Sequence, residues 1–344
     1  MRRKFNAPTS YDVALLAGVS QAVVSRAFQR EAPIADTTRA KVLAAAEQLG
    51  YLPNAVARSL ITKRSGLVAV LISQDTQRET SEVLFALSLA LQDQGFQPLL
   101  FSVAQEADSE RALTQALAYG VDAVISCLVL PLRALQRALQ RPCPVIMFNR
   151  EAPGDLASSV STDHAHAARL LAARLFAAGH RRYAVVTGPA GAPVSQLRTH
   201  GFIDRLHELG IPRQDISQFP GDYHYESGHA AGMALLDIAI REQRPDVVFC
   251  INDAMALGVL DAARFALMLQ VPHDVSVVGF DNIPYGQRPA YMLTTISQPF
   301  KALAESAASE TRARLDQDGG YRQIMLPAEL IERASAYLFP RVDG

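Results

Sequence analysis

The sequence lacks long hydrophobic runs and is poor in cysteine. None of its apolar stretches approaches the ~18 residues that a membrane-spanning helix requires, so we expect no transmembrane segment. The basic N-terminus has no apolar segment behind it, and a secretory signal is not expected either. The three cysteines, Cys127, Cys143 and Cys250, stand beside apolar residues, which predicts buried free thiols in a reducing cytoplasm.

Signatures of catalysis and of metal binding are also missing. The patterns HExxH, CxxC, GxSxG and GxGxxG do not occur. His164 and His166 are two residues apart and would lie on different faces of a helix, so they do not predict a shared metal ion. We therefore expect a protein that is not an enzyme and that uses no cofactor.

Charge is distributed unevenly along the chain. Residues 1–64 contain ten Lys and Arg against four Asp and Glu, whereas the remaining residues contain 23 against 30. The formal net charge of −1 therefore combines +6 at the N-terminal end with −7 elsewhere. A small basic module joined to a mildly acidic one is typical of a protein in which one part binds nucleic-acid phosphates.

The segment 11–26, YDVALLAGVSQAVVSR, predicts two short helices separated by a glycine. Thr9 or Ser10 is placed to cap the first helix, and Gly18 ends it. Ser20 would cap the second helix, whose inward face would consist of Val23, Val24, Ala27 and Phe28. Such a pair is either a helix-turn-helix, whose second helix enters the DNA major groove, or an αα-hairpin that is only part of a core.

Two further helices are expected before residue 66. Asp36 would cap a third helix, which ends at Gly50 and closes over the first two with Val42, Leu43, Ala46 and Leu49. The following stretch, YLPNAVARSL, has Pro53 at a helix start and residues that favour helix up to Leu60. We therefore expect a head of residues 1–52, followed by a hinge helix and linker at residues 53–65.

The motifs YDVA-x-x-AGVS-x-x-x-VSR, TRAKV and LGYLPNAVARSL lie within these first 60 residues. In them the chain closely resembles the head and hinge of the lactose/galactose-repressor (LacI/GalR) family. The resemblance implies that Gln21 and Ala22 meet base edges and that Arg26 also lies in the groove. It further implies that Leu60 wedges into the minor groove at the centre of the operator. The DNA-binding residues that it implies are Thr9, Ser20, Gln21, Ala22, Ser25, Arg26, Tyr51, Asn54, Ala57 and Leu60.

The chemistry of these side chains fits DNA contact, with some points left open. A Gln amide can bond adenine, and Ala can pack on a thymine methyl group. Val23 and Gln29 stand where the family usually has Thr and Asn, so the operator half-site stays open. Leu60 also fits as an ordinary apolar residue in a contact between domains.

From residue 66 onwards, apolar runs alternate with amphipathic helices. The runs GLVAVLIS, VDAVISCLVL, PVIMFN, YAVVTG, DVVFCIND and VSVVGFD are typical of buried parallel strands. Their two series predict two sheets that bind ligand at the carboxyl ends of the strands. The predicted fold class is an all-α helix-turn-helix head plus an α/β domain of two doubly wound parallel-sheet subdomains.

The motifs VSTDHAHAARLL, SQLRTHGF, CINDAMALG, VSVVGFDN and LTTISQP occur in this region. In them it resembles the effector domain of the same family, which is similar to periplasmic sugar-binding proteins. The resemblance implies that the chain crosses between subdomains near residues 161, 291 and 325. The two-lobed domain of residues 66–340 would then have an N-subdomain of about 66–161 plus 292–325 and a C-subdomain of about 162–291 plus 326–340.

Polar residues that follow the predicted strands are the candidate ligand contacts. Arg198 could clamp hydroxyls or a carboxylate, and Asp281 ends a buried strand. Asn252 is preferred over Asp253, which could instead cap the following helix. Asn149 stands where a family Asp is common, and the lost charge would suit a more anionic effector. The full set is Ser73, Gln74, Asp75, Phe148, Asn149, Arg198, Tyr223, Asn252 and Asp281.

Several of these residues have structural alternatives. Arg198 could be a surface charge, Asp281 could cap the next segment, and Tyr223 could be a core residue. For Arg198 the resemblance favours ligand binding, whereas for Asp281 its place at the carboxyl end of a strand favours it.

Together these features predict a ligand-controlled transcription regulator, most simply a repressor, in the cytoplasm and associated with the nucleoid. It would bind double-stranded palindromic operator DNA as a homodimer, with a tetramer left open, and it would not bind a membrane. The small-molecule effector would be a sugar or a sugar derivative, and a corepressor such as a nucleobase is the alternative. A solute-binding protein without a regulatory role and an enzyme on the same scaffold are the rivals from other classes.

Overall fold

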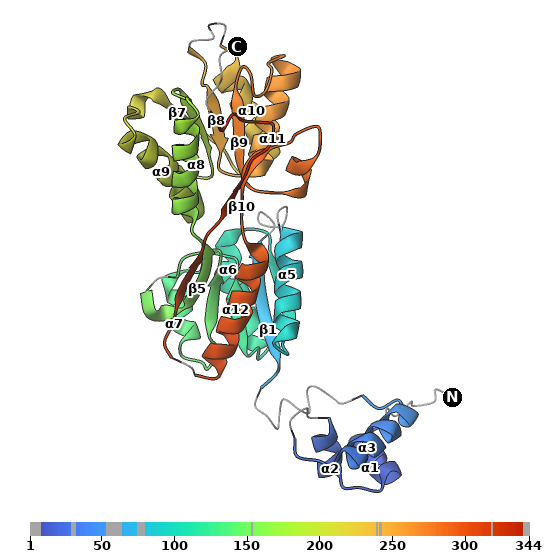
Figure 1. Cartoon of the computed structure of the whole chain (residues 1–344). Helices are drawn as coiled ribbons and strands as arrows, with labels where there is room; N and C mark the ends of the chain where they lie inside the picture. Colours follow the sequence, from blue (N-terminus) through green and yellow to red (C-terminus); the bar gives the residue numbers. More distant parts are fainter. Residues whose placement is uncertain are drawn as a thin grey trace, which may run out of the picture. The chain divides into compact units, whose positions relative to one another are not determined.

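The chain divides into two compact units, residues 1–66 and residues 67–344 (Figure 1). The computed structural model describes residues 8–28, 32–52, 64–73, 80–152, 154–238, 240, 243–317 and 319–339. In its described part the smaller unit consists of helices, and the larger unit contains two six-stranded sheets. This division agrees with the predicted head and α/β domain.

The smaller unit is built on α1 (Ser10–Ala17), α2 (Gln21–Ala27) and α3 (Asp36–Leu49). The Thr9 backbone N–H donates to the Asp12 carboxylate over 2.8 Å, and the Thr9 hydroxyl accepts from the Asp12 N–H over 3.4 Å. This reciprocal cap fixes the start of α1. Gly18 ends α1 in the left-handed conformation, with φ of 63°, and so allows the turn into α2.

Two details of the predicted head are wrong. Asp36 is the first residue of α3 rather than its cap, and Ala35 occupies the N-cap position. Leu43 is 43% exposed, whereas Ala45 is buried. The cause is the direction of the inward stripe of α3, which passes through Val42, Ala45, Ala46 and Leu49 at helical spacing.

The first sheet of the larger unit has the strand order β11-β5-β4-β3-β1-β2, and all neighbouring strands are parallel. Apolar residues of α5 and α12 cover one face of this sheet, and those of α6 and α7 cover the other. Its elements are β1 (Leu67–Ser73), α5 (Thr80–Asp93), β2 (Gln97–Val103), α6 (Ser109–Ala118), β3 (Ala123–Ser126), α7 (Leu132–Ala138), β4 (Val145–Phe148), β5 (Ser158–Thr162), α12 (Phe300–Leu315) and β11 (Gln323–Leu326).

The second sheet has the order β12-β10-β9-β8-β6-β7 and is parallel except for the terminal strand β12. In Figure 1, α8 and α9 lie on one side of it, and α10 and α11 lie on the other. Its elements are α8 (His164–Ala177), β6 (Tyr183–Thr187), α9 (Pro193–Glu208), β7 (Ile216–Pro220), α10 (Tyr225–Leu236), β8 (Val247–Cys250), α11 (Asp253–Asp261), β9 (Ser276–Asp281), β10 (Thr294–Ser297) and β12 (Glu329–Ile331).

The chain passes between these two lobes three times. The first crossing follows β5 and the third follows β11, close to the predicted residues 161 and 325. The second is not at residue 291, because β10 still pairs with β9 and the crossing comes only after Ser297. β5 (SSVST) and β10 (TTIS) contain mostly Ser and Thr, so neither stands out as an apolar run.

Candidate functional site

The outward face of α2 presents residues that the sequence predicts for DNA contact. Because Val24 and Ala27 are buried against the other helices, four of these residues are exposed: Gln21, Ala22, Ser25 and Arg26. Thr9 and Ser20 are exposed as well. Tyr51 is half-buried, with its ring centroid 5.9 Å from that of Phe28. This face can meet a DNA groove with a mixture of amide, hydroxyl and guanidinium groups.

Hydrogen bonds within the smaller unit orient the side chains of Gln21 and Arg26. Gln21 Nε2 donates to the Ser10 hydroxyl over 2.9 Å, across the turn between α1 and α2. The amide oxygen and a second N–H of Gln21 remain for the edge of an adenine. Arg26 Nε donates to the Ala22 carbonyl over 3.3 Å, which lays the guanidinium along α2.

Five predicted contact residues lie outside the residues that the structure describes. They are Asn54, Ala57 and Leu60 of the hinge, and Gln74 and Asp75 after β1. Their roles in binding DNA or ligand stay predictions.

In the larger unit, Arg198 of α9 and Asp281 at the end of β9 form a buried ion pair. Arg198 Nη2 lies 3.0 Å from Asp281 Oδ1, and Arg198 Nη1 donates to the Ile251 carbonyl over 2.6 Å. The guanidinium carbon lies 3.7 Å from the ring centroid of Phe280, so the ring covers one face of the cation. A planar guanidinium beside a carboxylate can bind the hydroxyl and carbonyl groups of a small molecule.

Gln298, directly after β10, connects this ion pair to the first lobe. Its amide nitrogen donates to Asp281 Oδ1 over 2.6 Å. Its amide oxygen accepts from Asn149 Nδ2 over 2.8 Å and from the Thr162 hydroxyl over 2.9 Å. Asn149 follows β4 of the first lobe and Asp281 ends β9 of the second, so a continuous chain of hydrogen bonds joins the lobes.

Three residues of this region have unusual backbone conformations. The φ values are 53° at Asn149, 70° at Tyr223 and 121° at Asp281, in the range that glycine adopts most easily. The Tyr223 ring packs over Gly188, where a Cβ atom would lie 2.8 Å from the tyrosine Cζ. Such backbone conformations persist only where the surrounding structure enforces them, and they cluster at binding sites.

The cap of α11 is not the residue that the sequence suggested, Asp253, while the ligand contact of Asn252 stays a prediction. Asn252 is the residue that caps α11, since its Oδ1 accepts from the Met255 N–H over 3.0 Å. Its Nδ2 donates to the Tyr223 carbonyl over 2.9 Å. Because capping needs the side chain one position before the helix, the asparagine is used structurally and Asp253 is left to face the strands.

Asp253 is fully buried beneath the ion pair. It accepts from the Thr295 hydroxyl of β10 and from the Ile283 N–H, the latter over 2.8 Å. Burial and the nearby Asp281 raise the pKa of Asp253 to about 7, although its hydrogen bonds act in the opposite direction. It therefore carries a proton over much of the acidic range.

Phe148 and Ser73 stand at strand ends, as predicted, but both are buried. Phe148 is 2% exposed and belongs to the apolar core between the first sheet and the helices α5 and α12. Its ring therefore takes part in core packing, and its role as a ligand contact stays a prediction. Ser73, the last residue of β1, is 1% exposed.

Sequence reasoning missed His164, Arg150 and Gln298. Each follows the end of a strand within two residues: His164 after β5, Arg150 after β4 and Gln298 after β10. Proximity to the carboxyl end of a strand is the signal that could have identified them. It was overlooked at β5 and β10 because those strands were not predicted.

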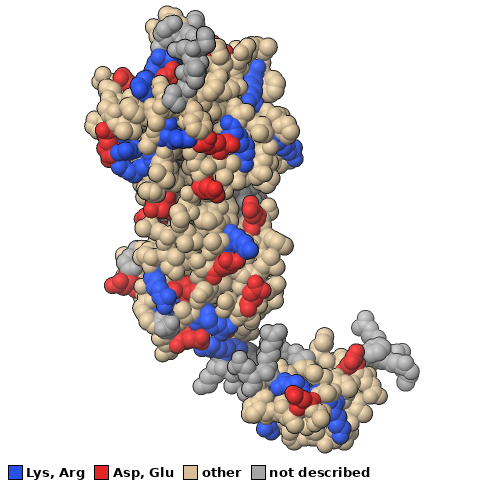
Figure 2. Space-filling model, in the orientation of Figure 1, with Lys and Arg blue, Asp and Glu red and all other residues tan. Residues whose placement is uncertain are grey.

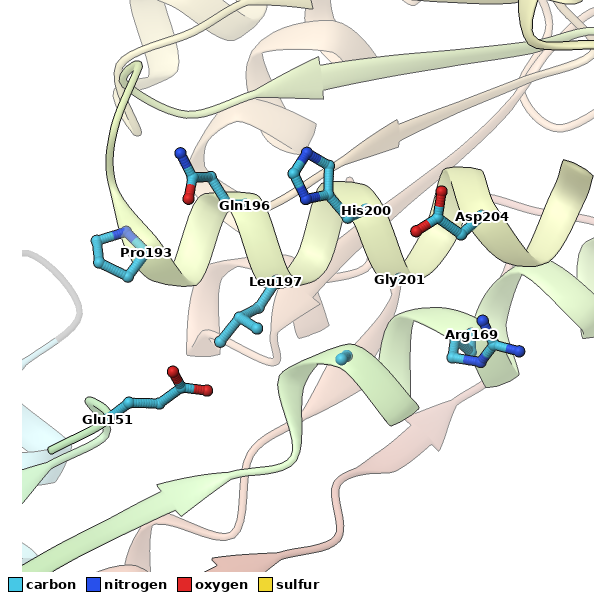
Figure 3. A pocket seen from close by; sticks show the side chains of 9 residues that line it. Glu151, Arg169, Pro193, Gln196, Leu197, His200, Gly201 and Asp204 are labelled. Atoms are coloured by element: carbon cyan, nitrogen blue, oxygen red, sulfur yellow. The ribbon is translucent and has the colours of Figure 1, made fainter. Parts of the chain in front are cut away.

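A separate groove of about 340 Å³ lies along α8 and α9. It is lined by Leu197 and His200 of α9, by Arg169 of α8 and by Glu151 of the first lobe, among others (Figure 3). These α9 residues lie on a different helical face from Arg198. The groove is therefore distinct from the ion-pair site.

The described residues contain no cluster that could hold a metal ion, and one face of the molecule shows mixed surface charge. No group of three or more His, Cys, Asp or Glu is arranged there to hold a metal ion. On the face drawn in Figure 2, basic and acidic side chains are interspersed over the larger unit. Among the described helices, none is long and apolar enough to cross a membrane.

Comparisons with known proteins support both units. The model for bacterial regulatory proteins of the lacI family matches residues 9–54, and the model for the periplasmic binding protein-like domain matches residues 172–336. The HTH-type transcriptional repressor CytR of Escherichia coli (strain K12) is 30% identical over 349 residues, which cover 98% of this chain and 99% of CytR.

Solved structures of similar regulators match this chain over both units. The lac repressor dimer bound to operator and the anti-inducer ONPF matches with a TM-score of 0.83 and 27% identity, over 96% of this chain and 99% of that one. A complex of the transcriptional regulator CelR with cellobiose matches with a TM-score of 0.70 and 28% identity, over 96% and 100% of the two chains. The predicted fold class is confirmed, and these relatives are named as regulators rather than enzymes. The chain belongs to the lacI family of bacterial regulatory proteins and is a DNA-binding transcriptional regulator.

Proposed function

We propose that the protein is a repressor that binds a palindromic operator as a homodimer and releases it when a small molecule occupies the ion-pair site. The hydrogen-bond chain from Asn149 through Gln298 to Asp281 and Arg198 carries this proposal. Ligand groups that compete for Asp281 would displace Gln298 and remove a link between the lobes. The cellobiose complex of a similar regulator supports a sugar or a sugar derivative as the effector.

The proposed dimer contact uses apolar residues of the first lobe. Phe85 and Leu89 of α5 are one helical turn apart and are 68% and 47% exposed. Leu100, on the edge strand β2, is 51% exposed. Exposed apolar side chains of this kind favour a protein partner, and the similar lac repressor structure is a dimer.

The proposed DNA contact uses the exposed residues of α2, with Leu60 as the wedge in the minor groove. Replacement of Leu60 by alanine should weaken binding to the operator more than binding to random DNA, because only the operator needs to be kinked. Equal losses on both DNAs would contradict the wedge. A regulator of this kind acts on the chromosome, so we place it in the cytoplasm with the nucleoid, and we expect no turnover of its effector.

The decisive experiment measures DNA binding by fluorescence anisotropy. Full-length protein is titrated against a palindromic site and a scrambled duplex at several salt concentrations, with and without candidate sugars. A salt-sensitive preference for the palindrome, lost when the effector is added, supports the proposal. Tighter binding on addition of a ligand would instead assign a corepressor, such as a nucleobase. The absence of any preference for the palindrome would overturn the regulatory role.

A further inference from the structure

Arg150 is a cation without an acidic partner beside the ion-pair site. Two residues after β4, it is half-buried, and its Nη1 donates to the Asn149 carbonyl over 2.9 Å. Within the described residues no carboxylate forms an ion pair with it. The neighbouring Glu151 directs its carboxylate towards Leu197, in the groove beside α9 (Figure 3). Among the described residues, therefore, no carboxylate lies within ion-pair distance of Arg150.

The charge of Arg150 acts on groups of both lobes. Burial raises the pKa of Cys127, just after β3, to about 12, and Arg150 acts against this rise. Burial, Arg198 and then Arg150 hold the pKa of His164 well below its usual range. Hydrogen bonds also connect this region, since Arg150 donates to Asn149 and Asn149 donates to Gln298. Gln298 in turn donates to Asp281, the partner of Arg198.

His164 adds an unused hydrogen-bond donor at this place. It is 2% exposed, and its Nδ1 accepts from Arg198 Nε over 3.4 Å. The neutral imidazole thus carries its proton on Nε2. In the described structure Nε2 is buried and has no hydrogen-bond partner. A buried N–H without an acceptor is costly, and an oxygen atom of a ligand would satisfy it.

Asn149 leaves the positive charge uncompensated. Arg198 is neutralised by Asp281, whereas the uncharged Asn149 adds nothing to balance Arg150. An aspartate at position 149 would supply a negative charge next to Arg150. It would also face the amide oxygen of Gln298, to which Asn149 now donates. The hydrogen-bond chain therefore favours asparagine, and position 149 supplies no negative charge to offset Arg150.

We propose that the effector is an anion, namely a small metabolite with a carboxylate or a phosphate group. Arg150 binds this group, and His164 donates a hydrogen bond to an oxygen atom of the same ligand. The inference rests on the proposed effector site between the lobes. It narrows the expected sugar derivatives to sugar acids and sugar phosphates, and the expected nucleobase compounds to nucleotides.

The test uses matched neutral and anionic ligands with full-length protein. Glucose is compared with gluconate and glucose 6-phosphate, ribose with ribose 5-phosphate, and adenosine with AMP, by thermal shift and then by calorimetric titration. In at least one comparison the anionic ligand should bind while the matched neutral ligand does not. Comparison of gluconate with the phosphate-containing ligands then shows whether the site binds a carboxylate or a phosphate group. For the ligand that binds, Arg150→Gln should raise the Kd roughly 10- to 100-fold, since a charge-assisted contact is lost.

Three further variants separate this role from a structural one. Arg150→Lys should retain part of the affinity, and Arg111→Gln, an exposed arginine of α6, should change nothing. His164→Phe, which keeps a ring of similar size, should weaken binding roughly 2- to 10-fold. Without ligand, Arg150→Gln should melt at the same temperature or higher, because an unbalanced charge is removed, whereas loss of a structural arginine would lower it.

The outcomes distinguish the two proposals. If only neutral ligands bind, and bind equally well to Arg150→Gln, the anionic effector is overturned while ligand control of the operator stands. The anionic effector is also overturned if no anionic member binds. Failure of the palindrome assay would overturn the regulatory role without affecting ligand binding.

Discussion

Replacement of Arg198 by methionine tests whether the ion pair at the strand ends is as buried as the structure indicates. The side chains of Arg198 and Asp281 are 5% and 0% exposed. Methionine fills most of the volume but leaves the Asp281 carboxylate without its counter-charge, which in buried pairs costs about 3–5 kcal/mol. Because the Gln298 amide still donates to Asp281, we expect the lower end, about 3 kcal/mol. In domains of this size that corresponds to roughly 6–12 °C in melting temperature.

Calorimetry of the full-length protein at fixed concentration measures this change. Arg111→Met, on an exposed arginine that is 67% accessible, is the matched control and should stay within about 0.5 kcal/mol of the parent. The double variant Arg198→Met/Asp281→Asn removes both charges and should recover about 1–2 kcal/mol relative to Arg198→Met. Equal melting temperatures for Arg198→Met and Arg111→Met would refute the reasoning, as would a double variant that is no more stable than Arg198→Met.

Three other properties follow from the packing and from the buried groups. In Gly258→Ala the added Cβ would lie 2.2 Å from a backbone carbonyl oxygen of α10, so we expect about 3 kcal/mol of destabilisation by calorimetry. In the control Gly320→Ala the added Cβ meets nothing within 4 Å, so the stability should not change. The pKa of Asp253 is raised to about 7, so the folded protein holds a proton that the unfolded chain releases, and stability should fall as the pH rises from 5 to 8. The melting temperature of Asp253→Asn should fall less between pH 5 and pH 8 than that of the parent protein. If the two fall equally, the pH dependence belongs to another group. Burial raises the pKa of all three cysteine thiols. A thiol reagent at pH 8 should therefore react with none of them in the native protein and with all three after denaturation. Reaction of the native protein would contradict their burial.

The sequence was sufficient to predict most of the fold because most strands are continuous apolar runs. VAVLI of β1 and VVFC of β8 are buried along their whole length, which local composition reveals. The head was predictable for a similar reason, since capping by Thr9 and termination by Gly18 are local events. β5 and β10 could not be recognised in this way, and the second crossing was consequently placed several residues too early.

The candidate site could be predicted only in part. Arg198 was identified because it belongs to a recognisable motif at the start of α9, and Asp281 because it ends a buried strand. Gln298 was not, because its partners Asn149 and Asp281 come from different lobes, and the contact with Asn149 spans 149 positions in sequence. The capping of α11 by Asn252 instead of Asp253 depends on a single residue of register at the start of α11, which local sequence does not fix.

The polar composition that concealed β5 and β10 has a role at the site itself. Thr162 of β5 donates through its hydroxyl to Gln298, and Thr295 of β10 donates to Asp253. Valine at either position would fill a similar volume, but it would leave a buried amide oxygen or carboxylate without this donor. Strands that cross between lobes must therefore pack into the core and also satisfy the polar groups on which the two lobes meet. This double requirement accounts for Thr162 and Thr295 in strands next to the ion pair, where an ordinary buried strand would carry aliphatic residues.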